Sequence, residues 1–248
     1  MVSAKYSICT TCYRSAPIVE SFLNPLLNLD DEYEIVVVDN DSDDGTFEKI
    51  QKYVQRVMAI KEKCTRGKGR QIAIDHSNGE IIINVEFDVG YLGISKAVDF
   101  FETTDKSKIY YFIIIGQKCN ASLYIGKKEI FKKVGGFPDL NYAEDLYLNK
   151  KAKKMGLFET VSIDMPITCL QVKGMSSGHE SRYEKSKFMQ IKRRIIATRD
   201  ILFVNDIGYH DLMIKYNLKG LRALLIGLPE YLFGRILRFT IKEPFIDE

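Results

Sequence analysis

Short apolar runs alternate with helix-like segments through about the first 130 residues of the chain. Strands are expected at residues 5–9, 33–39, 57–63, 80–87, 109–115 and 119–125, and helices within 16–28, 41–55, 67–77, 92–103, 127–134 and 143–155. This alternation predicts an α/β fold with a mostly parallel, Rossmann-like central sheet and flanking helices. The run YEIVVVD is apolar along almost its whole length, as is typical of a strand covered on both faces.

Acidic residues stand where two of these strands end. Asp39 closes one apolar run, and Glu86 and Asp88 follow the run Ile81–Val85. Ligands of open α/β sheets bind beyond the carboxyl ends of the strands. Because residues two apart in a strand point to the same side, Glu86 and Asp88 are expected to face that crevice together. Two carboxylates suit Mg²⁺ or Mn²⁺, although the pair alone is equally consistent with an ordinary turn.

Five motifs follow one another along residues 5–156. They are CTTCYR, VVVDNDSDDGT, RGKGRQIAIDHSNGE, VEFD and GGFPDLNYAEDLYL. Together, in this order and at these spacings, they resemble the family 2 inverting glycosyltransferases. The resemblance implies the GT-A fold and transfer of a sugar from a UDP- or GDP-sugar to an acceptor, with Mn²⁺ or Mg²⁺ as cofactor.

The resemblance also implies roles for particular residues. The nucleotide sugar is expected at Thr11, Tyr13, Asp39, Arg66, Lys68, Arg70 and Glu86, the metal at Asp88 and His179, and the catalytic base at Asp145 with Glu144 beside it. For His179 a surface loop is the alternative. Two positions depart from the family pattern, since Asn40 replaces a second Asp and Glu86 replaces the first Asp of the metal motif.

The expected chemistry explains these residue types. Breaking a bond between a sugar and a diphosphate builds negative charge on the leaving phosphate, which a divalent ion and basic side chains stabilise. An acceptor hydroxyl is a poor nucleophile, so a carboxylate within hydrogen-bond reach has to take its proton. Asp145 would do so, and a single displacement would invert the anomeric centre. Judged alone, Asp145 is equally an acid that favours a helix N-terminus.

The C-terminal part differs in composition. We expect a GT-A catalytic domain at 1–175 and a helical extension at 176–248. Residues 173–199 carry eight Lys or Arg and two Glu, a balance of +6, against +3 for the whole chain. The tail 218–239 alternates apolar clusters with charges, which suits a helix lying in the headgroup plane of a membrane. A helix that packs on the catalytic domain or forms a dimer is the alternative.

These features set the expected partners and location. A membrane-facing tail suits a lipid-linked acceptor such as a polyprenyl phosphate, and a glycan is the other candidate. Five cysteines without framework spacing, and no apolar run of about 20 residues, favour the cytoplasm or the cytoplasmic face of a membrane.

Other sequence signals bear on functions other than sugar transfer. Cys9 and Cys12 form a C-x-x-C pair that would suit a redox protein. The segment RGKGR lacks the order of a phosphate-binding loop. Basic residues interleaved with aromatic ones are consistent with RNA binding, but no nucleic-acid motif accompanies them, so nucleic acid is not an expected partner. A non-catalytic GT-A-like scaffold or a nucleic-acid-binding module is the alternative function.

Overall fold

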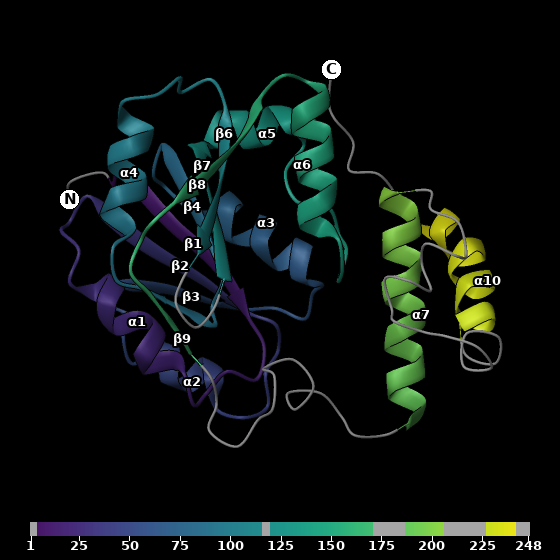
Figure 1. Ribbon diagram of the computed structural model, residues 1–248. Coiled ribbons are helices and arrows are strands. Elements are labelled where there is room, and N and C mark those ends of the chain that lie inside the picture. Colours follow the sequence, from purple (N-terminus) through teal and green to yellow (C-terminus); the bar gives the residue numbers. More distant parts are fainter. Residues whose placement is uncertain (1–3, 116–119, 171–186, 206–226, 242–248) are drawn as a thin grey trace.

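The computed structural model describes residues 4–115, 120–170, 187–205 and 227–241. A seven-stranded sheet runs through the centre in the order β3-β2-β1-β4-β7-β6-β8 (Figure 1). Its strands are β1 (Tyr6–Cys12), β2 (Tyr33–Asp39), β3 (Val57–Lys61), β4 (Ile81–Val85), β6 (Ile109–Ile115), β7 (Asn120–Lys127) and β8 (Phe158–Ile163). Neighbouring strands are parallel except at β7, which is antiparallel to β4 and to β6. The predicted α/β class and mostly parallel sheet are confirmed.

Helices cover both faces of the sheet. They are α1 (Val19–Leu27), α2 (Thr46–Gln51), α3 (Arg66–His76), α4 (Ile94–Glu102), α5 (Lys128–Val134) and α6 (Glu144–Lys154). Apolar residues of α1, α2 and α4, such as Phe22 and Phe101, pack into one hydrophobic cluster. Residues of α3, α5 and α6, such as Phe131 and Leu148, pack into a second cluster. Sheet residues alternate between the two, which explains why β2 is apolar throughout.

Two local features differ from the sequence expectation. A second, two-stranded sheet pairs β5 (Val89–Tyr91) with β9 (Ile167–Cys169). The helix expected within 41–55 is shorter, and Gly45 precedes it at φ 84°. The polar residues before it bond mainly to the loop after β1, since Arg14 N donates to Ser42 Oγ (2.8 Å) and Ala16 N to Asp44 Oδ2 (3.2 Å). They therefore tie the ends of β1 and β2 together.

Two further helices, α7 (Lys187–Val204) and α10 (Leu228–Leu237), lie beside the central sheet and the helices that cover it (Figure 1). Helix α7 packs back on α6, where the rings of Phe203 and Tyr147 stack at 5.8 Å and Lys150 Nζ donates to Val204 O (2.8 Å). Helix α10 packs on α7 and continues into the short helix η2 (Arg238–Thr240). The expected boundary at residue 175 lies outside the described residues, so the division at this point stays a prediction. Within the described ranges, no helix is both long and apolar enough to cross a membrane.

Candidate active site

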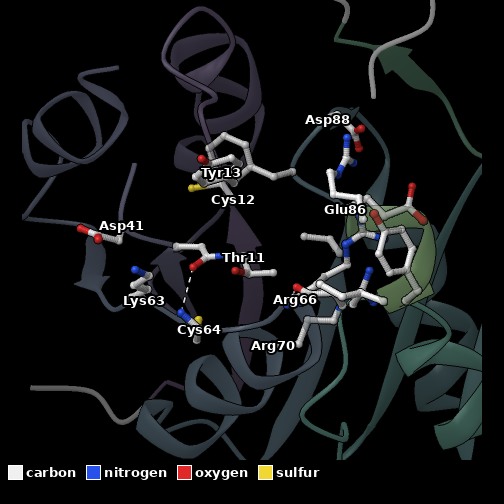
Figure 2. A pocket seen from close by; sticks show the side chains of 17 residues that line it. Thr11, Cys12, Tyr13, Asp41, Lys63, Cys64, Arg66, Arg70, Glu86 and Asp88 are labelled. Atoms are coloured by element: carbon white, nitrogen blue, oxygen red, sulfur yellow. Dashed lines mark hydrogen bonds between the residues drawn. The ribbon is translucent and has the colours of Figure 1, made fainter. Parts of the chain in front are cut away.

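A cleft of about 680 Å³ opens at the carboxyl ends of β1, β2 and β4. Asp41, Lys63 and Cys64 line one end of it, and the side chains of Glu86, Asp88, Arg66 and Arg70 gather at the other (Figure 2). Six of the predicted site residues line it, namely Thr11, Tyr13, Arg66, Arg70, Glu86 and Asp88. This is the edge of the sheet at which open α/β folds bind ligands.

A turn brings Glu86 and Asp88 to the cleft. Strand β4 ends at Val85, so strand alternation is not what pairs the two acids. Between them, Phe87 is buried and stacks on Phe22 with ring centroids 4.2 Å apart. The buried ring anchors the turn, and the acids on either side of it reach the cleft.

The Glu86 carboxyl group lies among several charges. Its Oε1 accepts a hydrogen bond from Ser122 Oγ of β7 (2.8 Å). Burial raises the pKa of Glu86, the Ser122 bond and the charge of Arg70 lower it, and the charges of Asp88 and Asp145 raise it. Asp88, Asp145 and Arg70 therefore act electrostatically on one carboxyl group, although they come from three separate segments of the chain.

Glu144 and Asp145 begin α6 but occupy different environments. Glu144 is 2% exposed, and its Oε1 lies 3.7 Å from Arg70 Nε and 3.8 Å from Arg66 Nη1. Burial raises the pKa of Glu144, and the two arginines oppose this. Asp145 is half-buried, and its Oδ1 accepts the N–H of Leu146 (2.8 Å). Asp145 does not form part of the cleft wall, but its charge acts on Glu86 and Glu144.

Asp39 is placed differently from the other predicted residues. Its carboxylate is fully buried and accepts hydrogen bonds from Ser42 N (3.0 Å) and from the Ser42 hydroxyl. Burial raises its pKa. The residues after it line the cleft instead, where Asn40 Oδ1 accepts the N–H of Cys64 (2.8 Å; Figure 2). Asp39 thus shapes the bend at the end of β2.

Lys68 is not among the described residues that line the cleft. Lys68 is exposed on α3, where its backbone N–H donates to the capping Thr65 Oγ1 (3.1 Å). His179 lies outside the described residues.

Left-handed backbone is concentrated around the cleft. Within the described residues, the non-glycine residues with positive φ are Arg14 (45°), Asp41 (49°) and Ala143 (60°). Asp41 lines the cleft, Arg14 follows Tyr13, and Ala143 follows Tyr142. Strained backbone of this kind clusters at functional sites.

Several cleft residues were not among the predicted site residues. Asn141 and Tyr142 stand in the motif GGFPDLNYAEDLYL, in the loop before α6, but were assigned no role, and Arg193 and Ile196 come from α7. The basic run at 173–199 was the one sequence signal for Arg193. Ile196 carried no signal, because only the packing of α7 beside the cleft gives it a place in the wall.

The carboxylates suit a divalent ion that the donor helps to hold. Among the described residues, no three His, Cys, Asp or Glu side chains are grouped closely enough to form a metal site by themselves. Mg²⁺ and similar ions are commonly bound by one or two carboxylates together with substrate phosphates. Asp88 and Glu86, with two arginines at the same end of the cleft, fit this mode of binding.

The redox interpretation of Cys9 and Cys12 is wrong. The two residues lie three apart in β1 and belong to opposite hydrophobic clusters, so their thiols lie on opposite faces of the sheet. Burial also raises the pKa of the Cys9 thiol, which disfavours the reactive thiolate. Cys9, Cys12 and Cys64 form no disulfide, whereas Cys169 is disulfide-bonded. A reducing compartment, inferred from the cysteine pattern, therefore stays a prediction.

Comparisons with solved structures identify the fold. A complex of TarS from Staphylococcus aureus with UDP-GlcNAc is similar, with a TM-score of 0.62 and 18% identity over 93% of this chain and 79% of that chain. The mannosyltransferase PcManGT from Pyrobaculum calidifontis, in complex with GDP-Man and Mn²⁺, has a TM-score of 0.58 and 17% identity over 95% and 74%. The predicted GT-A fold is confirmed.

Sequence comparisons identify the family. The poly(ribitol-phosphate) beta-N-acetylglucosaminyltransferase TarS of S. aureus is 30% identical over 92 residues. That match covers 34% of this chain and only 16% of TarS. The model of the family described as "Glycosyl transferase family 2" matches residues 7–161, which is more than half of the chain. The chain therefore belongs to glycosyl transferase family 2.

Proposed function

We propose that the protein transfers a hexosyl group from a UDP- or GDP-sugar to an acceptor hydroxyl or phosphate, with inversion and with Mn²⁺ or Mg²⁺. The observation that carries this proposal is the meeting of Glu86, Asp88 and Arg70 at one end of the cleft, with Asp145 near enough for its charge to act on Glu86. A non-catalytic scaffold has no need to place two acids and an arginine together there, since burying a charged group carries a cost of desolvation.

Each residue has a task in this reaction. Asp88 and Glu86 would hold the divalent ion, which stabilises charge on the departing diphosphate when it is bound. Arg66 and Arg70, held by Glu144, face the same negative charge. As the acceptor oxygen bonds to the anomeric carbon, the bond to the diphosphate oxygen breaks and its electrons leave with the nucleoside diphosphate. Asp145 takes the acceptor proton.

The partners of the protein follow from two sources. UDP-GlcNAc is bound in a TarS structure and GDP-Man with Mn²⁺ in PcManGT, so we propose a donor of one of these two kinds. Helix α10 exposes Leu232, Phe233 and Ile236, which supports peripheral attachment to the cytoplasmic face of a membrane. A polyprenyl phosphate or glycolipid acceptor would suit that location, and a soluble glycan would not require it.

A donor screen followed by one pair of variants tests the proposal. UDP, GDP and their sugars are added with Mn²⁺ or with EDTA, and thermal unfolding is followed. A donor at about 100 times its dissociation constant adds about 2.7 kcal/mol to stability. With that donor, Asp145→Asn is expected to lower turnover at least about 100-fold and to preserve the thermal shift.

Asp99→Asn is the matched control, because Asp99 is an exposed acid on α4. It should leave turnover unchanged. The proposal fails if no nucleotide shifts the unfolding temperature, or if Asp145→Asn is as active as Asp99→Asn.

A further inference from the structure

Helix α7 carries a buried acid that the family match does not reach. Asp200 is 0% exposed and lies outside the matched residues 7–161. Its Oδ2 accepts the backbone N–H groups of Asn141 (3.0 Å) and Tyr142 (3.1 Å). Its Oδ1 lies 2.6 Å from Arg199 Nη2, so the carboxylate is paired with a cation while it holds the loop. One oxygen of this buried carboxylate thus pairs with Arg199, and the other accepts from two peptide groups 58 and 59 residues earlier in the chain.

Those two peptide groups lead directly into the catalytic acids. Asn141 and Tyr142 line the cleft, and Ala143 follows them at φ 60°. Glu144 and Asp145 come next, at the start of α6. An alanine stays in the left-handed region only where its surroundings impose that conformation. The two hydrogen bonds to Asp200 fix the peptides on its N-terminal side and so set the direction in which α6 begins.

We propose that Asp200 is a positioning residue that orients Asp145 by holding the 141–142 loop from the C-terminal helix. The proposal rests on the proposed function in taking Asp145 as the base. It makes α7 part of the catalytic apparatus although Asp200 does not touch the reacting atoms. Attachment of α7 does not by itself require this carboxylate, because Lys150 and Tyr147 already join α6 to α7.

Helix α10 supports α7 at the same point. A Cβ on Gly234 of α10 would lie 2.5 Å from Thr198 Cγ2 and 3.1 Å from Arg199 N, so the two helices approach closely beside Asp200. A second contact joins Arg194 Nε to Glu230 Oε1 (3.0 Å). Helix α10 therefore stabilises α7 next to Asp200, and Asp200 in turn contacts the loop that precedes Asp145.

The test compares Asp200→Ala and Asp200→Asn with Lys150→Met in the 248-residue chain. Lys150→Met removes one hydrogen bond between α6 and α7 and leaves the loop bonds in place. With UDP-GlcNAc or GDP-mannose, whichever binds, Asp200→Ala is expected to lower kcat about 100-fold and to leave KM nearly unchanged. Asp200→Asn should recover part of this loss, because an amide oxygen still accepts. Lys150→Met should keep the wild-type kcat.

Amide hydrogen exchange gives a second readout that does not depend on activity. Asp200→Ala should accelerate exchange at Asn141 and Tyr142, and Lys150→Met should not. The proposal is overturned if exchange at these amides is unchanged, or if Asp200→Ala loses only as much kcat as Lys150→Met. If the wild-type protein turns over no donor while the exchange result holds, the proposed function has failed and the loop is still held by Asp200.

Discussion

Glu144 and Arg70 form an ion pair beside the cleft, with 3.7 Å between Oε1 and Nε. Arg70 is held on two further sides, since its Nη1 donates to Asn84 Oδ1 (3.0 Å) and its guanidinium lies 5.3 Å from the centre of the Phe137 ring. The two neighbouring acids of α6 therefore have separate tasks. Glu144 fixes an arginine, which leaves Asp145 as the candidate to accept a proton.

Removal of the Glu144 side chain is expected to destabilise the protein. Glu144→Ala leaves a cavity and removes the buried side chain that two arginines share, and we expect a loss of about 3 kcal/mol in the free energy of unfolding. Glu129→Ala is the control, because Glu129 is exposed and its carboxylate lies 4.0 Å from Lys127 Nζ, and it should cost less than about 0.5 kcal/mol. Urea unfolding of both variants measures this difference. Equal losses would show that the buried pair contributes no more than a surface pair.

The raised pKa of Glu86 predicts a pH dependence of stability. Burial raises this pKa above its value in the unfolded chain, so its contribution to stability is present at low pH and is lost as the pH rises through the folded-state pKa. Glutamine cannot ionise, so Glu86→Gln should gain stability relative to wild type between about pH 4 and pH 8. Urea unfolding at the two pH values measures the change.

Glu34 supplies a control of opposite sign. Burial would raise its pKa, but hydrogen bonds from Ser7, Asn78 and Gly79 outweigh burial and lower it. Its contribution is therefore present above the unfolded-state pKa and is lost as the pH falls. Glu34→Gln should lose stability relative to wild type over the same rise in pH. A common sign for the two variants would contradict one of the two assignments, and the sign itself shows which.

The glycines of the RGKG segment are expected to be required for packing. A Cβ on Gly67 would lie 2.0 Å from Pro138 O and 3.0 Å from Glu144 Cβ. Gly67→Ala should therefore push α3 away from the loop before α6, at a cost of about 1–3 kcal/mol, and lower turnover. Gly90→Ala is the control, since its nearest neighbour would lie 3.5 Å away, and it should be close to neutral. Thermal unfolding distinguishes the two, and a neutral Gly67→Ala would show that the loop can yield.

The exposed apolar face of α10 and η2 predicts binding to lipid. Leu232, Phe233, Ile236 and Phe239 are 51%, 55%, 67% and 79% exposed. These few residues are fewer than the roughly 20 that each partner contributes to a stable protein interface, which favours a membrane over a second copy of the chain. Phe233→Ser with Ile236→Ser should reduce sedimentation with phosphatidylglycerol-containing vesicles about tenfold.

The matched control is Val54→Ser, because Val54 is 70% exposed and lies outside the C-terminal helices. It should bind vesicles as wild type does. Unchanged vesicle binding by the α10 variant, or a shift from dimer to monomer on gel filtration, would contradict attachment through this face.

Part of the candidate site could be predicted from the sequence because its signals are local. Apolar periodicity marked the strands, the end of a strand placed Asp88 at one edge of the sheet, and the resemblance to the family implied Thr11 and Arg66. The strand pattern did not show that β4 stops before Glu86. The end of β4 at Val85 depends on Phe87, whose ring stacks on Phe22 of α1.

The sequence by itself determined the fold class, the family and most of the charged groups at the cleft, since all of these depend on residue type, order and short spacing. Tertiary structure decided which way each acid faces. Asp39 turns into the protein towards Ser42, Glu144 turns to two arginines, and Asp200 reaches a loop some 60 residues away. No periodicity records such contacts, because their partners become neighbours only when the sheet order and the packing of α7 bring distant segments together.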